Sequence, residues 1–221
     1  MPSDFPDLQA RLAESARYAL MRRLLPAIRH NLAGALQPVG MMAALLERRM
    51  KGVSPDLAQL AQNSQALNAL SREAAATSLG LMSWLAPRDN ELLAVGPALE
   101  ESLALMNTEL SFRGFAIVNQ AASSPLMLPR GVLRSVFTAS LMALTDPVQD
   151  AASVVVSSAQ SDGQIELQIA LQPGGNAALA DSSSRASAYR AMGWDDVLAL
   201  AQAEGVHLSH DACSVQLRHP A

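Results

Sequence analysis

The chain has 221 residues, of which 50% are hydrophobic and only 4% aromatic, and its formal net charge at pH 7 is −4. This length suffices for one large domain or two small ones with a buried core. The net negative charge and the lack of a dense Lys/Arg tract argue against a nucleic-acid surface. The sequence has no uninterrupted run of about 18 apolar residues, so we expect no membrane span. The single cysteine, Cys213, cannot form an internal disulfide. Since no charged-then-apolar leader precedes the first helix, we expect a cytoplasmic protein.

The first predicted element is a helix from about Asp7 to Met50, in which Pro26 and Pro38 should each cause a bend. At about 100° per residue, its apolar positions fall on one stripe. These positions are Leu20, Leu24, Ile28, Leu32, Leu36, Val39, Met42 and Leu46. The basic side chains of its early part are expected to form a solvated face. They are Arg11, Arg17, Arg22, Arg23 and Arg29.

One histidine, His30, lies on the face opposite this apolar stripe. Its helical neighbours are small or uncharged where a solvated helix normally carries Lys and Glu, so another protein could approach the imidazole closely. We predict that these neighbours form a partner-docking surface comprising Pro26, Ala27, Ala33, Gly34, Gln37 and Met41. An ordinary exposed histidine on an Ala-rich helix is the alternative that these residues leave open.

A second long helix should follow a tight break at Lys51–Pro55, with Ser54 as N-cap and Pro55 at the first helical position. Apolar and small residues then recur in steps of three and four, which is a heptad pattern. The positions are Leu57, Leu60, Ser64, Leu67, Ser71, Ala74, Ser78, Leu81 and Leu85. Two long helices joined by about five residues form an antiparallel hairpin, and we expect two copies to pair into a four-helix bundle.

After Pro87 the pattern changes to short helices and strands. The predicted strands are 92–95, 115–119, 153–160, 164–171, 206–209 and 214–218, and the predicted helices are 97–111, 128–145 and 189–204. Asp162-Gly163 is the strongest hairpin signal in the chain. We therefore predict an α+β protein with two domains. Residues 1–87 form a dimerising hairpin, and residues 88–221 form an α/β sandwich with one mixed sheet and about three helices on one face.

This order of elements resembles the core of bacterial sensor histidine kinases, a dimerisation and phosphotransfer hairpin followed by an ATP-binding domain. Arg29-His30-Asn31-Leu32, with Leu36, is similar to the histidine box of that family. The run Gly193-Trp194-Asp195-Asp196-Val197 and the closing Ser214-Val215-Gln216-Leu217 resemble its last helix and strands. The resemblance implies that His30 is a phosphoryl acceptor.

The sequence departs from that family where ATP would be bound. Asn31 stands in place of the acidic residue that usually follows the histidine, and an amide cannot take up a proton. The predicted helix 128–145 contains no Asn to hold Mg²⁺. Gly174-Gly175 is either a relic of the family's Gly-rich turns or, as we expect, part of a plain loop, and the lid is shortened to 177–188. We expect a degenerate domain that binds no cofactor and does not act as an ATP-using kinase.

The leading hypothesis is therefore a cytoplasmic, dimeric histidine phosphotransferase of a phosphorelay, in which His30 passes a phosphoryl group between receiver-domain aspartates. Mg²⁺ is expected on the partner receiver domain, and a hybrid histidine kinase is a further possible partner. The alternatives are a pseudokinase, a phosphatase or a dimeric scaffold that docks a receiver or kinase without phosphorylation of His30. His207, His210 and His219 lack the ligand spacing of a metal site.

Overall fold

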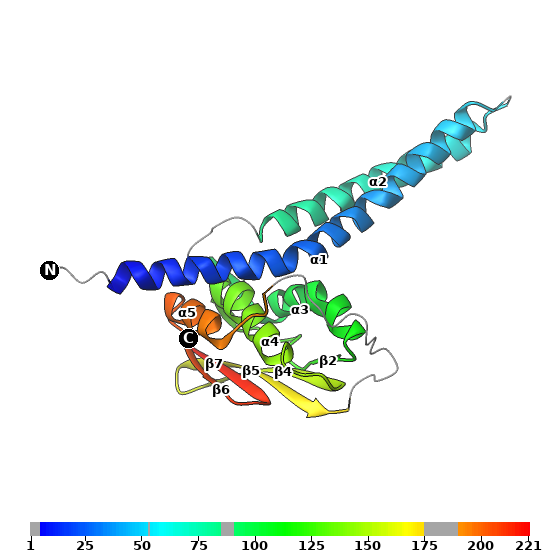
Figure 1. Ribbon diagram of the computed structural model, residues 1–221. Coiled ribbons are helices and arrows are strands. Elements are labelled where there is room, and N and C mark those ends of the chain that lie inside the picture. The colour runs from blue at the N-terminus through cyan, green and yellow to red at the C-terminus, as the bar shows by residue number, and fades with distance from the viewer. Residues whose placement is uncertain (1–4, 53, 85–90, 175–189) are drawn as a thin grey trace. The chain divides into compact units, whose positions relative to one another are not determined.

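The computed structural model describes residues 5–52, 54–84, 91–174 and 190–221 (Figure 1). The chain divides into two compact units. Unit 1 consists of Met1–Leu24 together with Arg88–Ala221, and unit 2 consists of Leu25–Pro87. The sequence placed residues 1–87 in one domain, whereas the structure groups residues 1–24 with the C-terminal half. The long first helix, α1 (Phe5–Met50), thus contributes to both units.

Unit 2 is a helical hairpin made by the second half of α1 and by α2 (Leu57–Met82), which runs back beside it (Figure 1). The predicted N-cap of α2 was wrong. Asp56, not Ser54, is the N-cap, and its carboxylate accepts hydrogen bonds from the backbone N–H of Ala58 at 3.0 Å and of Gln59 at 3.2 Å. A carboxylate satisfies the free donors of a first helical turn, so α2 begins at Leu57.

The buried seam of α2 follows a heptad spacing that differs in part from the predicted one. Its buried or half-buried positions include Leu60, Asn63, Leu67, Leu70, Ala74, Thr77, Ser78 and Leu81. Of the nine predicted positions, five are among these, Leu57, Ser64 and Ser71 are exposed, and Leu85 lies outside the described residues. Several large apolar side chains of the hairpin are exposed to solvent within one chain. They include Leu36, Leu57, Leu79 and Met82, which are 51%, 79%, 69% and 64% exposed.

Unit 1 contains a five-stranded mixed sheet with the order β2-β4-β5-β7-β6. The strands are β2 (Ala116–Asn119), β4 (Ala152–Ser161), β5 (Gln164–Pro173), β6 (His207–His210) and β7 (Ser214–Pro220). Only β2 and β4 are parallel. Asp162 and Gly163 have φ values of 51° and 72°, the left-handed pair that a two-residue hairpin turn requires, so the predicted β4–β5 hairpin is confirmed.

Helices cover one face of this sheet, as the sequence predicted (Figure 1). They are α3 (Val95–Phe112), α4 (Phe137–Thr145) and α5 (Trp194–Ala203), with a π-helical turn at Val132–Val136 leading into α4. Alternate residues of the central strands, such as Val154, Val156, Leu167 and Ile169, are fully buried and face the helices. All nine residues of α4 are buried, so this helix forms the centre of the domain.

Two predicted helices of unit 1 begin later than expected. The segment predicted as a helix from residue 128 starts with β3 (Met127–Pro129), which pairs antiparallel with β1 (Leu92–Ala94) in a separate two-stranded sheet. The last helix starts at Trp194 rather than Tyr189, because Gly193 takes an extended conformation at φ −96° and ψ 159°. Long-range pairing and a local cap, rather than helical periodicity, set these two boundaries.

Candidate functional site

His30 lies in the α1 segment of unit 2 and its side chain is exposed. The predicted docking surface around it is exposed as well, apart from Ala27, which is half-buried. Its exposed members are Pro26, Ala33, Gly34, Gln37 and Met41, and Met41 is 66% exposed. The structure therefore brings the histidine and all six predicted neighbours onto an accessible stretch of one helix.

The surface beside His30 is also open above the backbone. A Cβ atom added at Gly34 would have no heavy atom within 4 Å, so a partner can approach the helix closely at this turn. Asn31, directly after the histidine, is half-buried. The position after His30 therefore carries an amide, which is not a base, instead of a carboxylate. His30 is thus accessible, and the side chain that follows it in the chain is a half-buried amide.

Phosphate groups of nucleotides are commonly bound by the free N–H groups at helix N-termini and by Gly-rich turns. At the N-terminus of α5, the Asp196 carboxylate accepts from the Gly193 N–H at 3.1 Å and binds both terminal nitrogens of Arg190 at 2.8 Å. At the N-terminus of α3, the N–H groups of Val95 and Gly96 donate to backbone carbonyls. The first N–H groups of α3 and the N-cap N–H of α5 are therefore bound to acceptors within the protein.

The central helix of unit 1, α4, is shielded from solvent. Every residue of α4 is buried, and neither α4 nor the π-helical turn before it contains an Asn. Gly174, with φ 95°, adopts the left-handed backbone that glycine allows, while Gly175 and the predicted short lid at 177–188 lie outside the described residues. The described part of unit 1 is therefore a mixed sheet with helices on one face, and its buried central helix has no Asn side chain.

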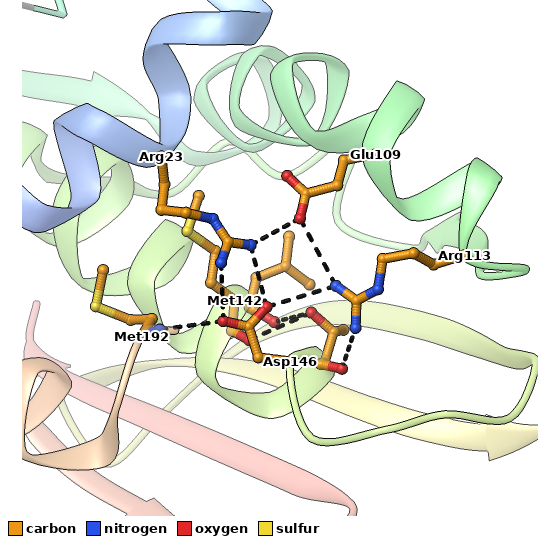
Figure 2. A network of polar contacts seen from close by, with 8 residues as sticks. Arg23, Glu109, Arg113, Met142, Asp146 and Met192 are labelled. Carbon is orange, nitrogen blue, oxygen red and sulfur yellow. Dashed lines mark hydrogen bonds and ion pairs between the residues drawn. The ribbon is translucent and has the colours of Figure 1, made fainter. Parts of the chain in front are cut away.

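A buried ionic cluster in unit 1 was not predicted, because Arg23 was assigned to the solvated face of α1. Its side chain is only 3% exposed. Both terminal nitrogens of Arg23 bind the Asp146 carboxylate, at 3.1 and 3.2 Å, and one also binds Glu109 at 2.7 Å (Figure 2). Arg113 approaches the same Asp146 at 3.5 Å, and the Met192 N–H donates to it at 3.0 Å. We call these five residues the Arg23 cluster.

The position of Arg23 in the helix explains its burial. Ala13, Ala16, Leu20 and Leu24 are all at most 2% exposed, and Arg23 continues their spacing of three to four residues. A register that started at Ala13 rather than Leu20 would have placed Arg23 on the buried side of α1. The signal was therefore present in the sequence, but small alanine side chains carry little weight in a search for an apolar stripe.

The remaining candidate residues have structural roles in the described chain. The ring of His210 stacks on Trp194, with centroids 3.8 Å apart. Asp211 accepts hydrogen bonds from the N–H groups of Cys213 and Ser214 and from the Ser214 hydroxyl, and these bonds lower the pKa of its carboxyl. Among the described residues, no three His, Cys, Asp or Glu side chains lie close enough together to hold a metal ion.

Within the described ranges, no helix is both long enough and apolar enough to cross a membrane. No protein-family model matches the sequence, and no curated protein matches it either.

The chain is similar to several solved structures at low identity. The histidine kinase AdeS of Acinetobacter baumannii is 18% identical, with a TM-score of 0.41, and the match covers 81% of this chain and 94% of that one. A bacterial phosphotransferase is 14% identical, with a TM-score of 0.37, and the match covers 90% of this chain and 94% of that one. The histidine kinase ThkA, in complex with the response regulator protein TrrA, is 10% identical, with a TM-score of 0.44. This match covers 97% of this chain and 66% of that one. All three TM-scores lie below 0.5.

Proposed function

We propose that the chain is a histidine phosphotransfer protein of a two-component signalling pathway, in which His30 carries a phosphoryl group from one receiver-domain aspartate to another. The observation that carries this proposal is the exposed His30 on a helix face of small residues with open space at Gly34. A phosphohistidine relay requires little else from this chain, because the receiver contributes both the aspartate and its Mg²⁺.

The proposed step balances without a further reactant. An unprotonated imidazole nitrogen of His30 attacks the phosphorus of the acyl phosphate on the receiver. The N–P bond forms as the P–O bond breaks, and the aspartate leaves as a carboxylate. The reverse step on a second receiver regenerates the imidazole. The attacking nitrogen uses its lone pair and carries no proton that must first be removed, so the step needs no general base beside His30.

The residues of unit 1 support a relay in place of a kinase. Neither α4 nor the π-helical turn before it contains an Asn that could hold Mg²⁺ for a nucleotide. We propose that unit 1 retains the fold of an ATP-binding domain and serves as an additional contact surface for the receiver.

We also propose that two chains pair through unit 2. Four large apolar side chains of the hairpin, Leu36, Leu57, Leu79 and Met82, are more than half exposed in a single chain. Pairing two hairpins into a four-helix bundle would bury such a face, as antiparallel bundles commonly do.

The first test is transfer of radiolabel from receiver domains of the same organism that are already phosphorylated. The expected result is an acid-labile, base-stable label on this protein, which a second receiver then removes. Incubation with labelled ATP and Mg²⁺ alone is expected to leave the protein unlabelled. If every receiver fails while the protein is folded, the docking or scaffold alternative replaces this proposal. Loss of receiver label as free phosphate, with none on the protein, would instead support the phosphatase.

A glycine substitution tests whether the open helix face is the docking surface. In an exposed helix interior, Ala is more favourable than Gly by about 1 kcal/mol, and neither Gly34 nor Gly80 has any atom near the added Cβ. Gly34→Ala and Gly80→Ala are therefore both expected to raise the free energy of unfolding in urea. Only Gly34→Ala should raise the KM for the phosphorylated receiver, by roughly fivefold to tenfold. Equal KM values for the two variants would remove Gly34 from the docking surface.

A further inference from the structure

Pro38 interrupts the hydrogen-bond ladder of α1 about two turns after His30. A proline has no N–H, so Pro38 cannot donate to the carbonyl of Gly34, which comes four residues before it. That carbonyl therefore lacks its helical donor in the interior of a 46-residue helix. A backbone acceptor in this position needs a donor from outside the ladder, which is either water or a partner.

The Gly34 carbonyl belongs to the docking surface around His30. Gly34 follows His30 by four residues in the same helix of unit 2, so the two share one face, about 6 Å apart along the axis. Gly34 and Pro38 are both exposed, and a Cβ atom at Gly34 would meet no heavy atom of the described residues within 4 Å. Because glycine has no side chain to shield its backbone, a donor on a partner can approach the carbonyl oxygen.

We propose that the carbonyl oxygen of Gly34 is a docking acceptor for the receiver domain, a proposal that rests on the phosphotransfer function proposed above. The receiver presents an N–H or O–H donor roughly 6 Å from its phosphorylated aspartate, the spacing of Gly34 from His30 along the helix. This donor replaces water at Gly34 as His30 meets the phosphorus. The hydrogen bond fixes the position of the receiver along α1, which alanine and glycine side chains alone do not specify.

Pro38→Ala tests the acceptor by supplying the missing donor. The new N–H binds the Gly34 carbonyl within the helix, so a receiver has to compete for that oxygen. The urea midpoint of unfolding should rise, because proline is the least favourable residue in a helix interior. The KM for a radiolabelled phosphorylated receiver should nevertheless increase about fivefold, with kcat changed less than twofold.

Gly40→Ala is the matched control for this gain in stability. Gly40 is also exposed in α1, and an added Cβ meets no described atom within 4 Å. The substitution should raise the urea midpoint because alanine favours the helix, but it leaves the Gly34 carbonyl without its helical donor. Gly40→Ala is therefore expected to keep the KM of the natural protein.

A backbone ester separates the acceptor from the bend that a proline causes. Lactic acid in place of Ala35 turns the Gly34 carbonyl into an ester carbonyl, which is a weaker acceptor, and keeps Pro38. This variant loses one helical N–H, so its urea midpoint should fall, while its receiver KM should rise as in Pro38→Ala. Lactic acid in place of the exposed Ala43, about 140° around the helix from His30, is the control and should lower the midpoint alone.

Three outcomes overturn the proposal in distinguishable ways. An unchanged KM in both Pro38→Ala and the Ala35 ester would remove Gly34 as an acceptor and leave the phosphotransfer function intact. A higher KM in Pro38→Ala alone would assign the effect to the bend in α1. No label on the natural protein from any phosphorylated receiver would overturn the phosphotransfer function itself, and the docking role of Gly34 with it.

Discussion

His30→Ala is expected to abolish labelling by phosphorylated receivers, a loss of more than about 10³-fold in the transfer rate, because the variant has no nucleophile for the phosphoryl group. Its unfolding midpoint in urea should stay close to that of the natural protein, because His30 is exposed, and exposed substitutions usually change stability by less than about 0.5 kcal/mol. Radiolabel on the separated protein and a urea denaturation curve measure the two quantities.

His207→Ala is the matched control, since His207 is also an exposed histidine but lies on β6 of unit 1. This variant should accept label at the natural rate. Label that persists in His30→Ala, or that disappears in His207→Ala, would move the acceptor away from α1 and contradict the proposed function.

Asp146→Ala is expected to lower the free energy of unfolding of unit 1 by about 3–5 kcal/mol. The substitution removes the acceptor shared by Arg23, Arg113 and the Met192 N–H, and it leaves the guanidinium of Arg23 buried with Glu109 as its remaining carboxylate. Urea denaturation followed by circular dichroism measures the change.

Glu109→Ala is the comparison for this loss. Glu109 also binds Arg23, but it is 38% exposed, so water can replace it and the cost should be nearer 1 kcal/mol. Equal decreases in the free energy of unfolding for Asp146→Ala and Glu109→Ala would mean that Asp146 is not the centre of the cluster. The apolar side chains of α1 would then be its main contacts within unit 1.

Local patterns in the sequence predicted most of the fold. Asp162-Gly163 between two alternating runs is sufficient to define a hairpin, because few dipeptides adopt a left-handed backbone at both positions. The long periodic segment before Met50 predicted α1 to within two residues. His30 was chosen as a candidate because it interrupts a surface of small residues where charged ones are usual, and its side chain is exposed in the structure. These features depend on neighbours in the sequence.

The errors arose where distant segments decide the outcome. β3 forms because Met127–Pro129 pairs with Leu92–Ala94, and the local sequence does not predict this pairing. The burial of Arg23 depends on Asp146, which is 123 residues away. A basic residue on a helix is usually solvated, so only the spacing of Ala13, Ala16 and Leu20 indicated otherwise.

The assignment of residues 1–24 to unit 1 has a consequence for the order in which the chain can fold. Unit 2 is inserted between the two parts of unit 1, between residues 24 and 88. During synthesis Arg23 is made first, whereas Glu109 follows 86 residues later and Asp146 follows 123 residues later. The hairpin has all its partners nearby and can form early, but the segment before it must wait for the C-terminal half. We therefore expect unit 1 to complete its folding last, with residues 8–24 among the last to reach their final contacts.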